Sequence, residues 1–230
     1  MRKTRYVWAI MALTGLLATT AHANVVNGQA ITLGSTDVGT GFTVTGSQPN
    51  PALSYQANFT VNSLTSSALD LGVTIYNTTS LTTLTQADIL SLGMSVDPNA
   101  SSVSISGGKI FTGAAMPTNG NFPGGFKDID VCATTGNNCS GGSSMNGLAA
   151  GGSDSFVLDI MGAFGATPMV TLDTFPVKFQ TNTTSYEFGS TTITTPTTLV
   201  IPVPEPGSLA LLGIGLVGIG LATRRNRQPV

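Results

Sequence analysis

The chain has almost no histidine or tryptophan. Among its 230 residues the single histidine is His22 and the single tryptophan is Trp8, and both lie near the N-terminus. If that end is removed, the rest of the chain can build neither a Ser-His-Asp nor a Cys-His site, and it lacks the imidazole base and the usual zinc ligand. We therefore expect a protein that is not an enzyme and that carries no cofactor.

The N-terminus has the pattern of a secretory signal peptide. Three basic residues within the first five precede an apolar stretch over 7–17, and Ala21 and Ala23 fit the small-x-small cleavage rule. We expect residues 1–23 to be removed, so that the mature chain begins at Asn24 and contains neither histidine nor tryptophan. This pattern predicts export by the Sec route.

Basic residues are also scarce between the two ends. Six of the nine lysines and arginines lie in the terminal segments, which leaves Lys109, Lys127 and Lys178 against ten carboxylates over residues 24–203. The difference, 3 − 10, gives this body a formal net charge of −7. Because nucleic acids require a basic surface, we expect no nucleic-acid partner.

The chain has only two cysteines, Cys132 and Cys139. In an exported protein an even pair across a Gly-Asn turn predicts a disulfide that closes a short loop. The chain-entropy estimate for such a loop is about 2–3 kcal/mol of stabilisation. A redox-active or metal-binding pair is the alternative, but it favours a Cys-x-x-Cys spacing and further ligands.

The last 27 residues, 204–230, form a segment of their own. It consists of Pro204, Glu205 and Pro206, then an apolar run of 14 residues over 209–222, then Arg224, Arg225 and Arg227. A helix of that length measures about 21 Å, less than the roughly 30 Å hydrocarbon core, so a buried or interfacial helix also fits. The arginines favour a transmembrane helix, because a basic cluster holds a chain end on the cytoplasmic side.

The order of these three elements resembles the PEP-CTERM sorting signal of Gram-negative bacteria that make exopolysaccharide. The resemblance rests on Pro204, Glu205 and Pro206 with Arg224 and Arg225. In that family the tail is taken to be recognised by an exosortase, a membrane transpeptidase-like enzyme that cuts near the Pro-Glu-Pro. The resemblance implies an exosortase partner, a transient stay in the inner membrane, and then a cell-surface or extracellular location.

The stretch 24–189 shows the hydrophobic alternation of β-strands. Apolar residues alternate with polar ones over 53–61, and the pattern repeats over 69–75 after the turn at 65–67, which predicts an antiparallel hairpin. Similar short runs occur at 25–33, 41–45, 96–105, 110–111, 126–131, 156–160, 170–172, 177–179 and 186–188. About nine or ten such strands predict an all-β antiparallel β-sandwich, immunoglobulin-like or jelly-roll-like in topology.

Three segments interrupt this pattern. Residues 85–88 resemble a capping box and predict one short helix that Gly93 ends. Residues 113–125 contain two prolines and four glycines and predict a long loop. The Thr- and Pro-rich segment 190–203 is predicted to be a linker or to contain a last strand over 198–201.

A second resemblance lies in the body. The run 131–139, the glycines that follow it, the strand predicted at 156–160 and the segment 175–180 are similar to the cistern-type subfamily of PEP-CTERM proteins. This resemblance implies one domain of a common architecture, without an activity that can be transferred.

Carboxylates are the acid–base groups that remain in quantity. Asp128 and Asp130 are expected to share one face of a strand, and Asp154, Asp159 and Asp173 are expected in polar strand-edge contexts. A glycosidase needs two carboxyl groups about 5–10 Å apart, one of them with a raised pKa. A calcium site near Asp128 and Asp130 is the other alternative, since calcium prefers hard oxygen ligands. The sequence contains no Asp-x-Asp-x-Asp-Gly loop, and we expect no metal site.

A carbohydrate-binding module is the alternative function of the body. Such modules are often β-sandwiches that stack sugars on exposed aromatic rings, and Tyr76 and Tyr186 are the candidates. The sequence also contains Asn-x-Ser/Thr sequons, which make glycosylation conceivable, at Asn58, Asn77, Asn99, Asn138 and Asn182. A chain this rich in Asn and Thr contains several such sequons by chance.

The sequence as a whole predicts a non-enzymatic exported protein of the cell surface or extracellular matrix. We expect it to be sorted and cleaved by an exosortase at the Pro-Glu-Pro tail and to associate with exopolysaccharide in a biofilm matrix. A secreted carbohydrate-binding module is the first alternative, and a hydrolase that uses only carboxylates is the second.

Overall fold

The computed structural model describes residues 25–27, 30–143 and 146–195. The signal peptide predicted over 1–23 and the tail 204–230, with its predicted helix, lie outside these ranges. The chain divides into two compact units, Met1–Pro196 and Thr197–Val230, and every described residue belongs to the first. In the described ranges no helix combines the length and the apolar character needed to cross a membrane.

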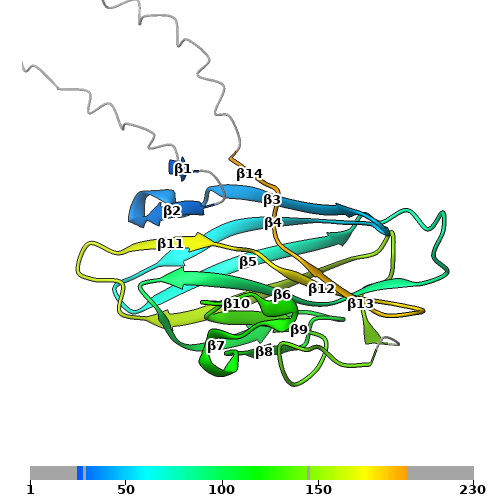
Figure 1. Ribbon diagram of the computed structural model, residues 1–230. Helices are drawn as coiled ribbons and strands as arrows, with labels where there is room; N and C mark the ends of the chain where they lie inside the picture. The colour runs from blue at the N-terminus through cyan, green and yellow to red at the C-terminus, as the bar shows by residue number, and fades with distance from the viewer. Residues whose placement is uncertain (1–24, 28–29, 144–145, 196–230) are drawn as a thin grey trace, which may run out of the picture. The chain divides into compact units, whose positions relative to one another are not determined.

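Strands dominate the described residues and form two antiparallel sheets (Figure 1). The six-stranded sheet has the order β14-β3-β4-β5-β10-β7. Its strands are β3 at Gly41–Pro49, β4 at Ala52–Leu64, β5 at Ala68–Asn77, β7 at Ala100–Ser106, β10 at Ser153–Gly162 and β14 at Thr192–Thr194. The predicted hairpin is confirmed as β4–β5, whose turn is closed by the N–H of Thr65 donating to the carbonyl of Ala68 at 2.8 Å.

The eight-stranded sheet is built around β6, Ala87–Asp97. It also contains β1 at Val25–Asn27, β2 at Ala30–Gly34, β8 at Gly113–Ala115, β9 at Val131–Thr134, β11 at Met169–Asp173, β12 at Val177–Thr181 and β13 at Ser185–Phe188. β6 pairs with β9, β11 and β12, and through them with β8, β2 and β13. It therefore connects all the parts of this sheet.

The core lies between the two sheets. The ring of Phe175, in the connection between β11 and β12, lies 6.2 Å from that of Phe42 and 5.5 Å from that of Phe59 on the opposite sheet. The hydroxyl of Tyr55 donates to the carbonyl of Phe175 at 2.5 Å. Gly46 makes room for this tyrosine, because a Cβ there would lie 2.3 Å from the ring. Two facing sheets with a shared core fit the expected β-sandwich, while the choice between the two topologies stays a prediction.

The short helix predicted at 85–93 is wrong. These residues belong mostly to β6, and all positions from Ala87 to Met94 are buried. One face of β6 packs in the core. On the other face, Leu90 lies against Gly141 and Gly147, and Gly93 lies against Phe122 and Ile129. A strand covered on both faces has no polar alternation, so a short apolar run of this kind is hard to tell from a helix by periodicity.

Smaller differences concern the connections. The strand expected at 110–111 is a loop, and the predicted loop 113–125 contains β8 and two single 3₁₀ turns, Thr118–Gly120 and Pro123–Gly125. A third such turn, Ser35–Asp37, follows β2. Within the segment 190–203, β14 pairs with β3, whereas the strand predicted at 198–201 lies outside the described residues.

Candidate functional site

The residues predicted to direct export and sorting are not among the described ones. They are Ala21, Ala23, Pro204, Glu205, Pro206, Arg224, Arg225 and Arg227. The structure therefore bears only on the body, where a pocket lies at the end of β6.

The structure contains the disulfide predicted between Cys132 and Cys139, with a Cα–Cα distance of 5.7 Å. Cys132 is the second residue of β9, and the carbonyl of Cys139 accepts a hydrogen bond from the hydroxyl of Ser91 on β6 at 2.7 Å. Phe122 and Ile129 pack around the bridge in a small cluster separate from the main core. The bridge thus ties the loop after β9 to the sheet.

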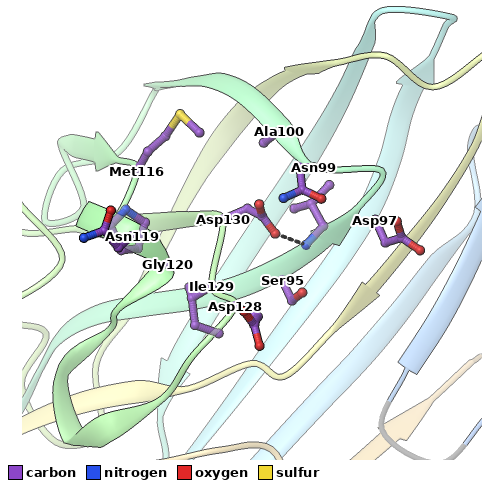
Figure 2. A pocket seen from close by; sticks show the side chains of 12 residues that line it. Ser95, Asp97, Asn99, Ala100, Met116, Asn119, Gly120, Asp128, Ile129 and Asp130 are labelled. Atoms are coloured by element: carbon purple, nitrogen blue, oxygen red, sulfur yellow. Dashed lines mark hydrogen bonds between the residues drawn. The ribbon is translucent and has the colours of Figure 1, made fainter.

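The pocket beside this cluster has a volume of about 540 Å³. Its walls come from the end of β6 at 95–97, the start of β7 at 99–100, and two parts of the connection between β8 and β9, at 116–120 and 128–130. Figure 2 shows Asp130 in the middle of this group, with Asn119 on one side and Asn99 on the other. Carboxylates and amides thus dominate the polar part of its wall.

Asp128 and Asp130 do not share a strand face, because β9 begins only at Val131. Asp128 has a φ of 57°, in the left-handed region, so the chain turns sharply there. Asp130 is held to β6 at two points: its backbone N–H donates to the carbonyl of Met94 at 3.1 Å, and its Oδ2 accepts from the N–H of Val96 at 2.8 Å (Figure 2). Asp128 and Asp130 therefore line the pocket from a loop that is hydrogen-bonded to β6.

The surroundings of Asp130 disfavour its charged form. Partial burial raises the pKa of this carboxyl above its ordinary value, and the hydrogen bond from Val96 opposes the change. The negative charges of Asp128, Asp97 and Asp173 raise the pKa further. The pocket is thus a site of net carboxylate repulsion.

The chemistry available here is that of hydrogen-bond acceptors facing water. In the described ranges, no three side chains of the His, Cys, Asp and Glu types gather closely enough to hold a metal ion. A raised pKa is one property of a general acid, and a glycosidase also needs a second carboxylate across the scissile bond.

The other predicted aspartates are scattered. Asp159 lies exposed on β10, and Asp173 ends β11 opposite Ser95. The polar strand-edge context expected for Asp154 is wrong, because only 7% of this residue is exposed. Its carboxylate accepts the backbone N–H groups of Lys109 at 3.2 Å and of Ile110 and Phe111 at 2.8 Å each. Asp154 therefore holds the loop after β7.

The two candidate tyrosines lie on different sheets. Tyr76 belongs to β5 and points to the outer face of the six-stranded sheet, whereas Tyr186 belongs to β13 and packs against the main core. They cannot form one stacking platform. The sequon at Asn77 is buried, with 1% of the residue exposed, and its amide donates to the carbonyls of Ala87 and Leu148 at 2.8 Å each.

Among the polar residues of the pocket, Ser95, Asp97 and Asn119 were not singled out from the sequence, and Asn99 was named only as a sequon. Asp97, Pro98 and Asn99 form a turn signal that could have marked the end of β6. Nothing local connects that turn with Asp128 and Asp130, which reach it only because β9 pairs with β6.

Residues 202–226 match the family model of the PEP-CTERM protein-sorting motif. This motif implies a secreted protein of Gram-negative bacteria that an exosortase processes. No curated protein matches the chain. One solved structure that matches is titled "Crystal structure of yeast GGA1_GAE domain-P21", with 9% identity, 61% of this chain and 89% of that chain covered, and a TM-score of 0.29.

Proposed function

We propose that the chain is a non-enzymatic exported protein that an exosortase cleaves at its tail and that then joins the exopolysaccharide matrix of the cell surface. The observation that carries the proposal is the sorting motif at residues 202–226, which follows a folded β-sandwich body. A disulfide in that body suits a protein that works outside the cytoplasm.

Each part of the tail has a role in this proposal. The arginines at 224, 225 and 227 keep the end of the chain in the cytoplasm, because positive charge resists translocation. The apolar run 209–222 then holds the protein briefly in the inner membrane. The exosortase cuts near Pro204–Pro206, and the body leaves the membrane.

The test is the intact mass of the mature protein from its native host, with and without the exosortase gene. We expect a chain from Asn24 to the region 204–207 when the enzyme is present and a longer chain when it is absent. A mass that runs to Val230 in both strains contradicts the sorting step and indicates a permanent C-terminal anchor.

A matched pair of variants sharpens this test. Replacing Glu205 by Ala in the Pro-Glu-Pro should stop processing in the host that has the enzyme. Replacing Glu187 by Ala, on β13 of the body, should leave the mass of the processed chain unchanged apart from the substitution. Equal processing of both variants contradicts recognition through the Pro-Glu-Pro.

The cistern-type resemblance and the carbohydrate-binding alternative stay proposals. Since Tyr76 and Tyr186 lie on different sheets, a glycan site cannot depend on both of them. We rank a hydrolase that uses only carboxylates last, because Asp154 is held by backbone N–H donors and Asp159 lies exposed on β10, and neither belongs to the group of carboxylates around Asp130.

A further inference from the structure

The outer face of the six-stranded sheet carries two adjacent rows of uncharged polar side chains. Each row runs across the five strands β14, β3, β4, β5 and β10 and contains one residue from each, paired in register with its neighbours. We call them the neutral rows. The first consists of Thr194, Thr43, Asn58, Thr74 and Ser155, and the second of Thr192, Thr45, Gln56, Tyr76 and Ser153.

The side chains of the neutral rows face away from the core. Along β4 they alternate with Tyr55, Ala57 and Phe59, which are at most 1% exposed, and the other strands show the same alternation. At about 4.8 Å between strands, a row of five spans about 19 Å. None of the neutral-row residues lines the pocket at Asp130 or either of two further pockets of the described residues, one between 116–123 and 138–140 and one between 109–112, 135 and 146–147. The rows therefore form an open, extended surface, whereas small ligands prefer concave sites.

Hydrogen bonds within the first row, and one from the second row to the first, hold these side chains in place. The hydroxyl of Thr43 and the amide of Gln56 both donate to Oδ1 of Asn58 at 3.0 Å, and the hydroxyls of Thr74 and Ser155 lie 2.9 Å apart. In the described part of the chain, these bonds leave the Nδ2 donor of Asn58 and the Oε1 acceptor of Gln56 for an outside partner. Donors and acceptors thus stand next to each other on a surface that is already organised.

The charges on and around the neutral rows indicate whether a partner should be charged or neutral. The rows themselves contain no ionisable side chain except the phenol of Tyr76. The nearest carboxylates on the same outer face, Asp70 and Asp159, oppose each other about 13 Å along β5 from Thr74, whereas Asp154 of β10 faces inward and is buried. The three lysines of the body lie on other elements, Lys178 on β12 and Lys109 and Lys127 in loops. The rows themselves thus offer a polyanion no cationic side chain, whereas their hydroxyls and amides match a neutral polyol.

We propose that the neutral rows are a docking surface for an uncharged polysaccharide strand. Sugar hydroxyls both donate and accept, as the side chains of the rows do, and the ring of Tyr76 offers an apolar surface with a polar end. This inference rests on the proposed function, because it names the part of the body that would contact the matrix. It differs from the family-based expectation in assigning the contact to one sheet face and to neutral glycans.

The experiment measures retention of the processed protein from its native host on four polymers: cellulose and dextran, which are neutral, alginate, which is a polyuronate, and chitosan, which is cationic. We expect binding to at least one neutral polymer and weaker or no retention on the other two. Replacing both Asn58 and Tyr76 by Ala should reduce the affinity for the neutral polymer about tenfold or more, since central aromatic contacts dominate such surfaces.

Two threonines provide the matched control. Thr74 pairs with Ser155 at 2.9 Å on the proposed face, and Thr171 pairs with Thr32 at 3.0 Å on the eight-stranded sheet. Thr74→Ala should weaken retention, and Thr171→Ala should not. Each single variant removes one side-chain hydroxyl from an outer sheet face, so the two melting temperatures should agree. A difference in retention between the two variants then shows which sheet face binds the polymer.

Three results overturn the inference: no retention on either neutral polymer, preferred retention on alginate or chitosan, or equal retention of the Thr74 and Thr171 variants. The mass of the same preparation separates this failure from that of the proposed function. A chain that ends near 204–207 and binds no neutral polymer leaves the sorting step intact, whereas a chain that ends at Val230 contradicts the sorting step itself.

Discussion

Asp154 and Asp130 lie in two regions that shift the pKa of a carboxyl group in opposite directions. Burial raises the pKa of both side chains, but three backbone N–H groups donate to Asp154 and outweigh burial, so its pKa is lowered. Asp130 receives one backbone donor and faces three other carboxylates, so its pKa is raised. The balance between burial and backbone donors therefore decides the direction in which each pKa is shifted.

The two carboxylates also differ in what they contribute to the fold. The loop that Asp154 holds carries Phe111 into the core, where its ring lies 5.3 Å from that of Phe156. Asp130 lines an open pocket and is repelled by its neighbours. We therefore infer that Asp154 is part of the fold, whereas Asp130 can be changed without loss of the fold.

The largest effect is expected from Asp154→Ala. It leaves the N–H groups of Lys109, Ile110 and Phe111 without their acceptor, which should lower the free energy of unfolding by about 3 kcal/mol. Urea denaturation measures the change. Asp159→Ala is the control, because Asp159 lies exposed on the same strand and should change stability by less than about 0.5 kcal/mol. Equal losses for both variants would contradict the role of Asp154.

The pH dependence of stability should separate the charge of Asp154 from its shape. A lowered pKa means that the stabilisation is complete above the ordinary value of 3.8 and is lost as the pH falls through the folded-state pKa. Asp154→Asn removes this dependence, so its stability should approach that of the wild type below about pH 4. A constant difference between pH 2 and pH 7 would show that the charge is irrelevant.

A smaller change of opposite sign is expected from Asp130→Asn. Because the pKa of Asp130 is raised, the wild-type protein loses stability as the pH rises above 3.8, and the asparagine variant does not. The asparagine can still accept from Val96. We expect a gain of less than about 1 kcal/mol at pH 7 in low salt, since solvent screens charges in an open pocket. Thermal melts at pH 3 and pH 7 measure it, and a loss at pH 7 would contradict the repulsion.

The smallest effect is expected from Asp128→Asn. Removing this neighbouring charge should lower the pKa of Asp130 towards its ordinary value, with a stability change of a few tenths of a kcal/mol. The pKa can be followed by NMR titration of the Asp130 carboxyl. A pKa that does not move would exclude the charge of Asp128 as a cause of the raised value.

The sequence predicts strands well where one face of a sheet meets water. Over 53–61 and 69–75 each apolar residue is buried and each polar one lies outside, so the alternation is visible in the sequence and confirmed in β4 and β5. β6 is covered on both faces, which removes the alternation, and a local capping-box pattern then indicated a helix.

The candidate sites divide in a similar way. Cys132 and Cys139 are close in sequence, so their disulfide could be predicted and the structure contains it. The pocket at Asp130 is formed by β6 and by a loop far from it in the sequence, since Val96 and Asp130 are 34 residues apart. Asp128 and Asp130 were expected on a strand because a period of two does not reveal the turn at Asp128.

The amino-acid sequence by itself predicted the signal peptide and determined the sorting motif, the all-β class and the acidic, histidine-free body, because each is a matter of composition or of local order. Only the tertiary structure decided which strand is central, which aspartate is held by backbone donors, and which polar residues form a continuous face. These depend on pairing between segments far apart in the chain, and such pairing is set by how all the apolar faces are buried together rather than by any one segment.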